Sequence, residues 1–166
     1  MVTVYVDTNI IIAKYKPDDP LYKSVNKFFG MGYDYVISPI TLIELYSVLA
    51  RIRPFLRLEK GLENANLDTI IAFIIHDLKL KLVARSFMTR LQVFGTKIRI
   101  PLEYHLVIKL AEKLKLKTLD ILHIAYAYLL RDVLNYFTTG DSDILGAKEI
   151  IEQQIGVKVR APSELI

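Results

Sequence analysis

Five acidic residues from four distant segments of the chain could together bind a metal ion: Asp7, Glu44, Asp120, Asp141 and Asp143. Each stands in or beside a run of apolar residues, where a carboxylate is costly unless a partner offsets its charge. A hard divalent cation such as Mg²⁺ or Mn²⁺ prefers carboxylate oxygens and water as ligands. We therefore expect a carboxylate metal site, provided that the fold brings these segments together.

The periodicity of apolar residues predicts strands that alternate with helices. The expected strands are 2–6, 35–38, 134–138 and 157–160, and the expected helices are 21–29, 39–51, 66–78, 102–114, 119–131 and 143–154. This alternation predicts an α/β layer fold with a central, mainly parallel sheet of four to five short strands. A length of 166 residues suits a single domain spanning 1–166.

The stretch from about 56 to 100 is least like a strand–helix unit and is expected to be a helical excursion within that domain. Val83, Phe87, Leu91 and Phe94 have helical spacing, which predicts a basic amphipathic helix over 80–94.

The expected topology places the acids at one edge of the sheet, because ligands of parallel α/β sheets bind where strands end. Asp7 and Asp141 each follow a strand. Asp120 begins a helix that leads back into the strand at 134–138, so it returns to the same edge. Glu44 lies about one and a half turns into the helix after the second strand.

Each acid also has a structural explanation. Asp7 and Asp143 could cap helices, Asp120 could complement a helix dipole, and Glu44 could complete a capping box with Thr41. For all five acids together these structural explanations are weaker, because no Lys or Arg is expected nearby to neutralise the charge of the carboxylates. Of the two starts possible for the helix around Glu44, Ser38-Pro39 is the stronger.

The basic residues are concentrated in one stretch. Overall, Lys plus Arg number 22 against 18 for Asp plus Glu, which gives a net charge of +4 and a mild bias toward polyanionic partners. From Leu78 to Leu102 there is no acidic residue. The basic residues there, Lys79, Lys81, Arg85, Arg90, Lys97 and Arg99, could form part of an RNA path or only a solvated face.

Several classes of function are disfavoured. The chain has no cysteine, which excludes disulfides and thiolate chemistry and fits a reducing cytoplasm. We expect no signal peptide, and no uncharged run approaches the roughly 18 residues of a membrane span. His76, His105 and His123 lack metal-ligand spacing and are expected to pack in the core or at the surface.

Four short motifs resemble, in their order, those of the PIN-domain nucleases. They are Val4-Tyr5-Val6-Asp7-Thr8-Asn9, then Thr41-x-x-Glu44, then Leu119-Asp120-Ile121-Leu122-His123-Ile124-Ala125, then Thr139-Gly140-Asp141-x-Asp143. The resemblance covers nearly the whole chain apart from the excursion at about 56–100.

The resemblance implies a three-layer α/β/α fold and Mg²⁺- or Mn²⁺-dependent hydrolysis of RNA. The acidic quartet of the family falls on Asp7, Glu44, Asp120 and Asp141, which are expected to be the catalytic and metal-binding residues. The supporting positions fall on Thr8, Asn9, Thr139 and Asp143. Many small members resemble the VapC toxins, which implies a homodimer neutralised by a small antitoxin protein.

Two other motifs fail on single residues, and two other functions stay open. The strand before Asp7 is similar to the nucleophile strand of haloacid-dehalogenase-type phosphatases, but Asn9 cannot act as their second acid. Residues 141–152 partly match an EF-hand loop, but Leu145 stands where an oxygen ligand is needed. A non-catalytic RNA- or protein-binding module and an RNA-processing nuclease that is not a toxin remain alternatives.

Overall fold

A five-stranded sheet forms the centre of the molecule, in a computed structural model that describes all residues 1–166. The strands are β1 (Thr3–Val6), β2 (Asp34–Ile37), β3 (Lys81–Leu82), β6 (Tyr136–Thr138) and β7 (Lys158–Arg160). They lie in the order β3-β2-β1-β6-β7, and every neighbouring pair is parallel. The prediction of a mainly parallel sheet of four to five short strands is confirmed.

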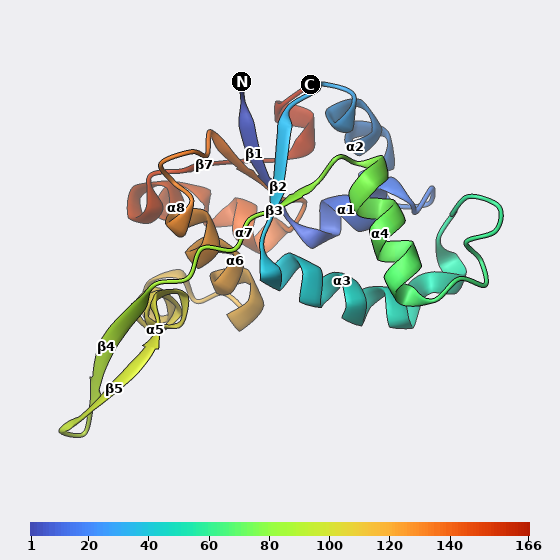
Figure 1. The fold of residues 1–166 in the computed structure, drawn as a ribbon. Coiled ribbons are helices and arrows are strands. Elements are labelled where there is room, and N and C mark those ends of the chain that lie inside the picture. The colour runs from blue at the N-terminus through green and yellow to red at the C-terminus, as the bar shows by residue number, and fades with distance from the viewer.

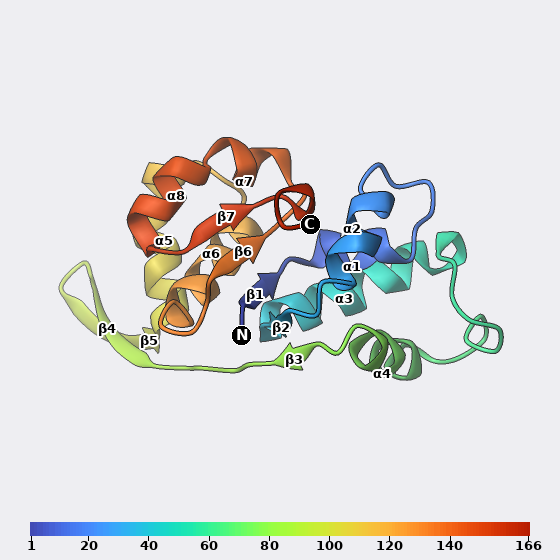
Figure 2. The same cartoon turned by 90° about the horizontal axis from the view of Figure 1, so that it is seen from above.

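Helices cover both faces of this sheet. They are α1 (Thr8–Lys14), α2 (Tyr22–Phe29), α3 (Pro39–Ile52), α4 (Leu67–Asp77), α5 (Leu102–Leu114), α6 (Thr118–Leu129), α7 (Ser142–Gly146) and α8 (Lys148–Ile155). Figure 2 shows α5 to α8 on one side and α1 to α4 on the other. Short 3₁₀ turns lie at Arg53–Phe55 and Pro162–Glu164. The α/β/α arrangement expected from the sequence is therefore present.

The alternation of side chains along β1 explains the two cores. Val4 and Val6 point into a cluster with α1, α3 and α4, while Tyr5 points into a second cluster with α5 to α8. All three side chains are completely buried. A strand covered on both faces must be apolar throughout, so the functional groups can only stand at its ends.

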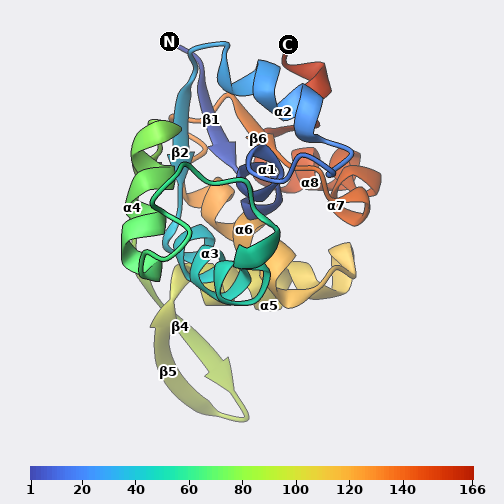
Figure 3. The ribbon, with the colours of Figure 1, turned by 90° about the vertical axis from the view of Figure 1, so that its right-hand side faces the viewer.

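Residues 88–101 form a hairpin and not a helix, so the prediction of a helix over 80–94 is wrong. β4 (Met88–Val93) pairs with antiparallel β5 (Thr96–Pro101) across a turn at Phe94-Gly95, and the hairpin projects from the body (Figures 1 and 3). Alternating polar and apolar residues in both strands fit a period of two better than a helical period. The excursion thus combines α4, the sheet strand β3 and a hairpin.

One further element differs from the sequence-based expectation, and another begins as expected. The helix expected over 143–154 is divided into α7 and α8 at Ala147. The helix expected over 39–51 begins as predicted, with Ser38 accepting a hydrogen bond from Thr41 N and Pro39 in the first turn. No helix of the structure is both long and apolar enough to cross a membrane.

Candidate metal centre

Asp7 stands where β1 ends and α1 begins, and it is held from several sides. Its backbone N–H donates to Thr138 O of β6 at 3.1 Å, which ties the ends of two strands together. Its carboxylate accepts hydrogen bonds from Thr8 N at 2.7 Å, from Asn9 Nδ2 at 2.8 Å and from Thr139 Oγ1 at 2.6 Å. Burial raises the pKa of Asp7, and Glu44 adds to this, while His123 and Thr139 oppose it. The carboxylate is therefore fixed in position before any ligand arrives.

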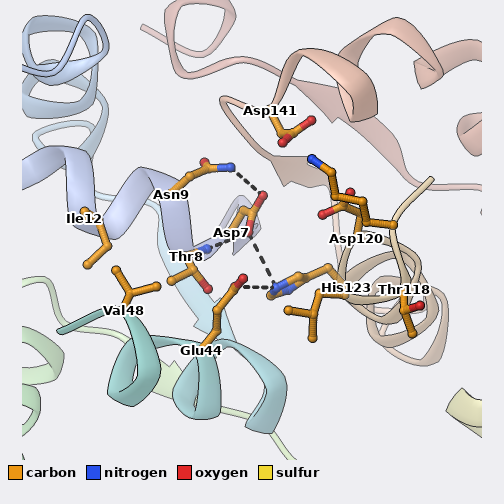
Figure 4. A pocket seen from close by; sticks show the side chains of 12 residues that line it. Asp7, Thr8, Asn9, Ile12, Glu44, Val48, Thr118, Asp120, His123 and Asp141 are labelled. Atoms are coloured by element: carbon orange, nitrogen blue, oxygen red, sulfur yellow. Dashed lines mark hydrogen bonds and ion pairs between the residues drawn. The ribbon is translucent and has the colours of Figure 1, made fainter. Parts of the chain in front are cut away.

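Glu44 reaches the same point from α3. Its Oε2 lies 3.0 Å from Nε2 of His123, and the same nitrogen lies 3.6 Å from Oδ1 of Asp7 (Figure 4). The hydrogen bond from His123 lowers the pKa of Glu44 against the opposing effect of burial. Ligand atoms of Asp7, Glu44 and His123 all lie within 4.8 Å of one another.

His123 was not expected to belong to the site. It is almost completely buried on α6, and its Nδ1 lies 2.8 Å from the hydroxyl of Tyr5, which also contacts Ser38 Oγ at 2.7 Å. Burial lowers the pKa of His123, but Tyr5, Asp7 and Glu44 raise it well above the ordinary value for histidine. The two carboxylates therefore favour the protonated form of the His123 ring. The sequence signal for this role was its position three residues after Asp120, because residues at this spacing lie on the same face of a helix.

Asp120 lies in the first turn of α6, as expected, and has no hydrogen-bond partner. Its Oδ2 is buried and unpaired. Burial raises the pKa of Asp120, and the charges of Asp141 and Asp7 raise it further, while Lys117 and His123 oppose the shift.

Asp141 both lines the cleft and caps a helix. Its Oδ1 accepts from Asp143 N at 2.7 Å and from Ile144 N at 3.2 Å, so Asp141 is the N-cap of α7, a role expected of Asp143. Asp143 is exposed, 3.7 Å from Lys117 Nζ, and does not line the cleft. Of the expected supporting residues, Thr8 and Asn9 line the cleft, and the buried Thr139 lies behind Asp7.

All four predicted carboxylates line one cleft of about 510 Å³ (Figure 4). Lys117 also lines it, although no Lys or Arg was expected there. The donors are mainly oxygens, one of which is buried without a partner, so they fit a hard cation such as Mg²⁺ or Mn²⁺. The closest group is Asp7, Glu44 and His123, while Asp120 and Asp141 complete the rim.

The comparisons with known proteins agree with this geometry. The family model described as "PIN domain" matches residues 4–150, which is most of the chain. The chain belongs to the PIN domain family. The matched range contains all four motifs, from Val4 to Asp143. A comparison with curated proteins found no match.

Solved structures share the fold at low sequence identity. VapC20 of Mycobacterium tuberculosis, described as a sarcin–ricin loop cleaving toxin, has a TM-score of 0.54 and 14% identity, over 87% of this chain and 94% of that one. VapBC2 of Rickettsia felis, bound to a DNA fragment from its promoter, has a TM-score of 0.53 and 13% identity, over 96% and 98%. FitAcB of Neisseria gonorrhoeae has a TM-score of 0.51 and 16% identity, over 96% and 97%. These similarities concern the fold.

Proposed function

We propose that this PIN protein is a divalent-metal-dependent endoribonuclease. The supporting observation is that four carboxylates from four segments line one cleft, where Asp120 has a buried oxygen without a partner. Asp7, Glu44, Asp120 and Asp141 would hold Mg²⁺ or Mn²⁺. The metal would supply an activated water at neutral pH and stabilise negative charge on the phosphate and the leaving oxygen.

The residues around the carboxylates have separate tasks in this proposal. Thr139 and Asn9 both donate to Oδ2 of Asp7 and fix the carboxylate, which leaves little freedom to lose when ligand binds. His123 orients Glu44, since its Nε2 lies 3.0 Å from Oε2 of Glu44. The exposed Lys117 stands at the rim, where it can contact a phosphate of the substrate. The hydroxyl of Thr8 lies beside Glu44 and helps to lower its pKa, and Asp143 lies within ion-pair distance of Lys117.

Cleavage of single-stranded RNA tests this proposal directly. We expect cleavage with Mg²⁺ or Mn²⁺ and none with EDTA. Asp120→Asn should reduce the rate by at least about 100-fold, because even outer partners of metal sites contribute 10- to 100-fold. Glu149→Gln is the matched control, since Glu149 is an exposed acid in the first turn of α8 and should leave the rate unchanged. Full activity in excess EDTA would refute the proposal.

We further propose that the protein is the toxin of a toxin–antitoxin pair in the cytoplasm, built as one domain over 1–166. VapC20, which shares the fold, is described as a toxin, and this supports the assignment to toxins. The VapBC2 complex, which also shares the fold, supports an antitoxin partner. Tyr104 and Ile108, one turn apart on α5 and at least half exposed, support a homodimer.

Expression in a bacterial host tests the biological class. Growth should stop with the wild type and continue with Asp7→Asn, and light scattering should give the mass of two chains. RNA cleavage without any growth defect would instead indicate an RNA-processing nuclease. A chain that binds RNA but cleaves none under any metal would indicate a binding module.

A further inference from the structure

The β4–β5 hairpin is an arm that stands away from the sheet (Figures 1 and 3). It packs at its base against α5, and Leu102 N donates to Phe87 O there at 2.7 Å. The arm lies within the stretch from Leu78 to Leu102 that contains no acidic residue. An isolated two-stranded hairpin is only marginally stable in water, so an unfavourable residue is costly there. Residues that disfavour the hairpin therefore point to a contact outside the chain.

The register of the hairpin separates its basic and apolar side chains. Arg90 pairs with Arg99 and Gln92 with Lys97, while Leu91 pairs with Ile98 between them. Directly paired residues share a face, and successive residues alternate between faces. The three basic residues therefore lie together on one face, and all three are exposed.

This arrangement is unfavourable for the hairpin alone. Arg90 and Arg99 are directly opposite each other, and like charges in such a pair destabilise a sheet. Neither they nor Lys97 make an ion pair or a side-chain hydrogen bond in the structure. By contrast, Lys81 pairs with Asp34 at 2.6 Å. A bound polyanion would offset this repulsion, because its negative charges attract both arginines.

The tip of the arm is unfavourable in a second way. Phe94 and Gly95 form a two-residue turn with φ values of 46° and 82°. Such a turn favours Asn-Gly, because residues with a bulky side chain rarely adopt positive φ. Phe94 is also fully exposed, so its ring contacts nothing in the chain that would favour it there. An aromatic side chain in this place suits stacking on an unpaired base.

We propose that the β4–β5 arm is an RNA-binding element, with the Arg90, Lys97 and Arg99 face on phosphates and Phe94 stacked on a base. The identity of the nucleic acid as RNA rests on the proposed ribonuclease function. The structure also divides the basic residues of this stretch. Lys81 is paired and Lys79 lines a different cavity, so neither belongs to the arm surface.

The arm and the cleft lie at opposite ends of α6. Lys117 and Asp120, at the start of α6, line the cleft. At the other end of α6, the carbonyl oxygen of Leu129 lies 3.5 Å from Nη1 of Arg85, which stands at the base of the arm. A helix of 12 residues is about 18 Å long. Only an RNA of several nucleotides reaches both places, so the arm favours long or folded substrates over short ones.

RNA affinity measured in EDTA tests the arm without any cleavage. The probe is a long single-stranded RNA with a fluorescent label, titrated at several salt concentrations. The test variant is Arg90→Glu/Lys97→Glu/Arg99→Glu. The control variant, Lys23→Glu/Lys27→Glu/Lys158→Glu, has the same net charge but changes exposed lysines on α2 and β7. We expect the slope of log affinity against log salt to fall by about 2 in the test variant alone, at roughly 0.7 per lost phosphate contact.

Phe94→Asn separates binding from folding. Asn tolerates positive φ, so this variant should melt at or above the temperature of the wild type while it binds the long RNA several-fold more weakly. Cleavage of a short oligonucleotide that fills only the cleft should stay unchanged in both arm variants.

Three outcomes would overturn the inference. Equal RNA affinity of the test and control variants would show that the arm does not bind RNA. Equal RNA affinity together with a changed oligomeric state of the test variant in light scattering would assign the arm to a contact between protein chains. In both cases a cleaved short oligonucleotide leaves the ribonuclease function standing, whereas a wild type that neither binds nor cleaves RNA removes both.

Discussion

Neutralising Asp120 should stabilise the protein when no metal is present, which is unusual for a substitution of an ordered residue. Its Oδ2 is buried and unpaired, and Asp7 and Asp141 lie close enough to raise its pKa. Leaving a buried polar group unsatisfied costs about 1–3 kcal/mol, and more when the group is charged. Asp120→Asn removes the charge and its repulsion by Asp141 and Asp7 but keeps a polar atom at this position, so it relieves only the part of this cost that the charge causes. Against this, Asp120→Asn loses a favourable charge in the first turn of α6, which contributes about 0.3–1 kcal/mol.

The balance favours the Asp120→Asn variant by about 1 kcal/mol. For a chain of this size, that difference raises the Tm by about 2–4 °C. Mn²⁺ at a hundredfold excess over its Kd should stabilise the wild type by about 2.7 kcal/mol. The variant should lose most of this gain, because one of the proposed ligands has lost its charge.

Melting curves in EDTA and in Mn²⁺ provide the assay, with two comparisons. Asp141→Ala should melt lower than the wild type in EDTA, because the carboxylate of Asp141 caps α7 and replacing such a cap by Ala costs about 1 kcal/mol. Glu149→Gln should change little, since Glu149 is exposed. The reasoning is refuted if Asp120→Asn melts at or below the temperature of the wild type in EDTA. It is also refuted if Mn²⁺ raises the Tm of Asp120→Asn as much as that of the wild type.

Two further predictions concern residues around the carboxylates. His123→Leu should destabilise the metal-free protein by about 1–3 kcal/mol, because Glu44 loses its hydrogen-bond partner beside the carboxylate of Asp7; Mn²⁺ should restore more stability to it than to the wild type, and an equal Mn²⁺ shift in melting curves would contradict this. Gly140→Ala should lower the free energy of unfolding in urea by about 1 kcal/mol, the low end for overpacking, since the new methyl would overlap only the end of the Leu21 side chain. An unchanged urea midpoint would show that Leu21 moves aside freely.

Local sequence was enough to predict most of the sheet and its helices. The run Val4-Tyr5-Val6 indicates a strand buried on both faces, and Ser38-Pro39 indicates a helix start, because these signals depend on neighbouring residues alone. Parallel topology then implies that the acids after the strands meet at one edge, and the cleft contains all four of them.

The hairpin was missed because residues 80–94 carry two overlapping periods. The spacing of Val83, Phe87 and Leu91 fits a helix, while the residues of 88–93 alternate as in a strand. The choice depends on pairing with 96–101 across the Phe94-Gly95 turn, which a window over one segment does not contain.

The roles within the cleft depended on tertiary structure. By sequence, Asp120 and Asp141 are equally candidate metal ligands, one at the start of a helix and the other after a strand. In the fold, Asp141 satisfies two backbone N–H groups of α7, whereas Asp120 faces other carboxylates with one oxygen buried and unpaired. His123 likewise became a site residue only when α3 and β1 brought Glu44 and Asp7 to its nitrogen. Residue type and order determine which groups can meet, but the charge that each one carries depends on the distances and burial that packing sets.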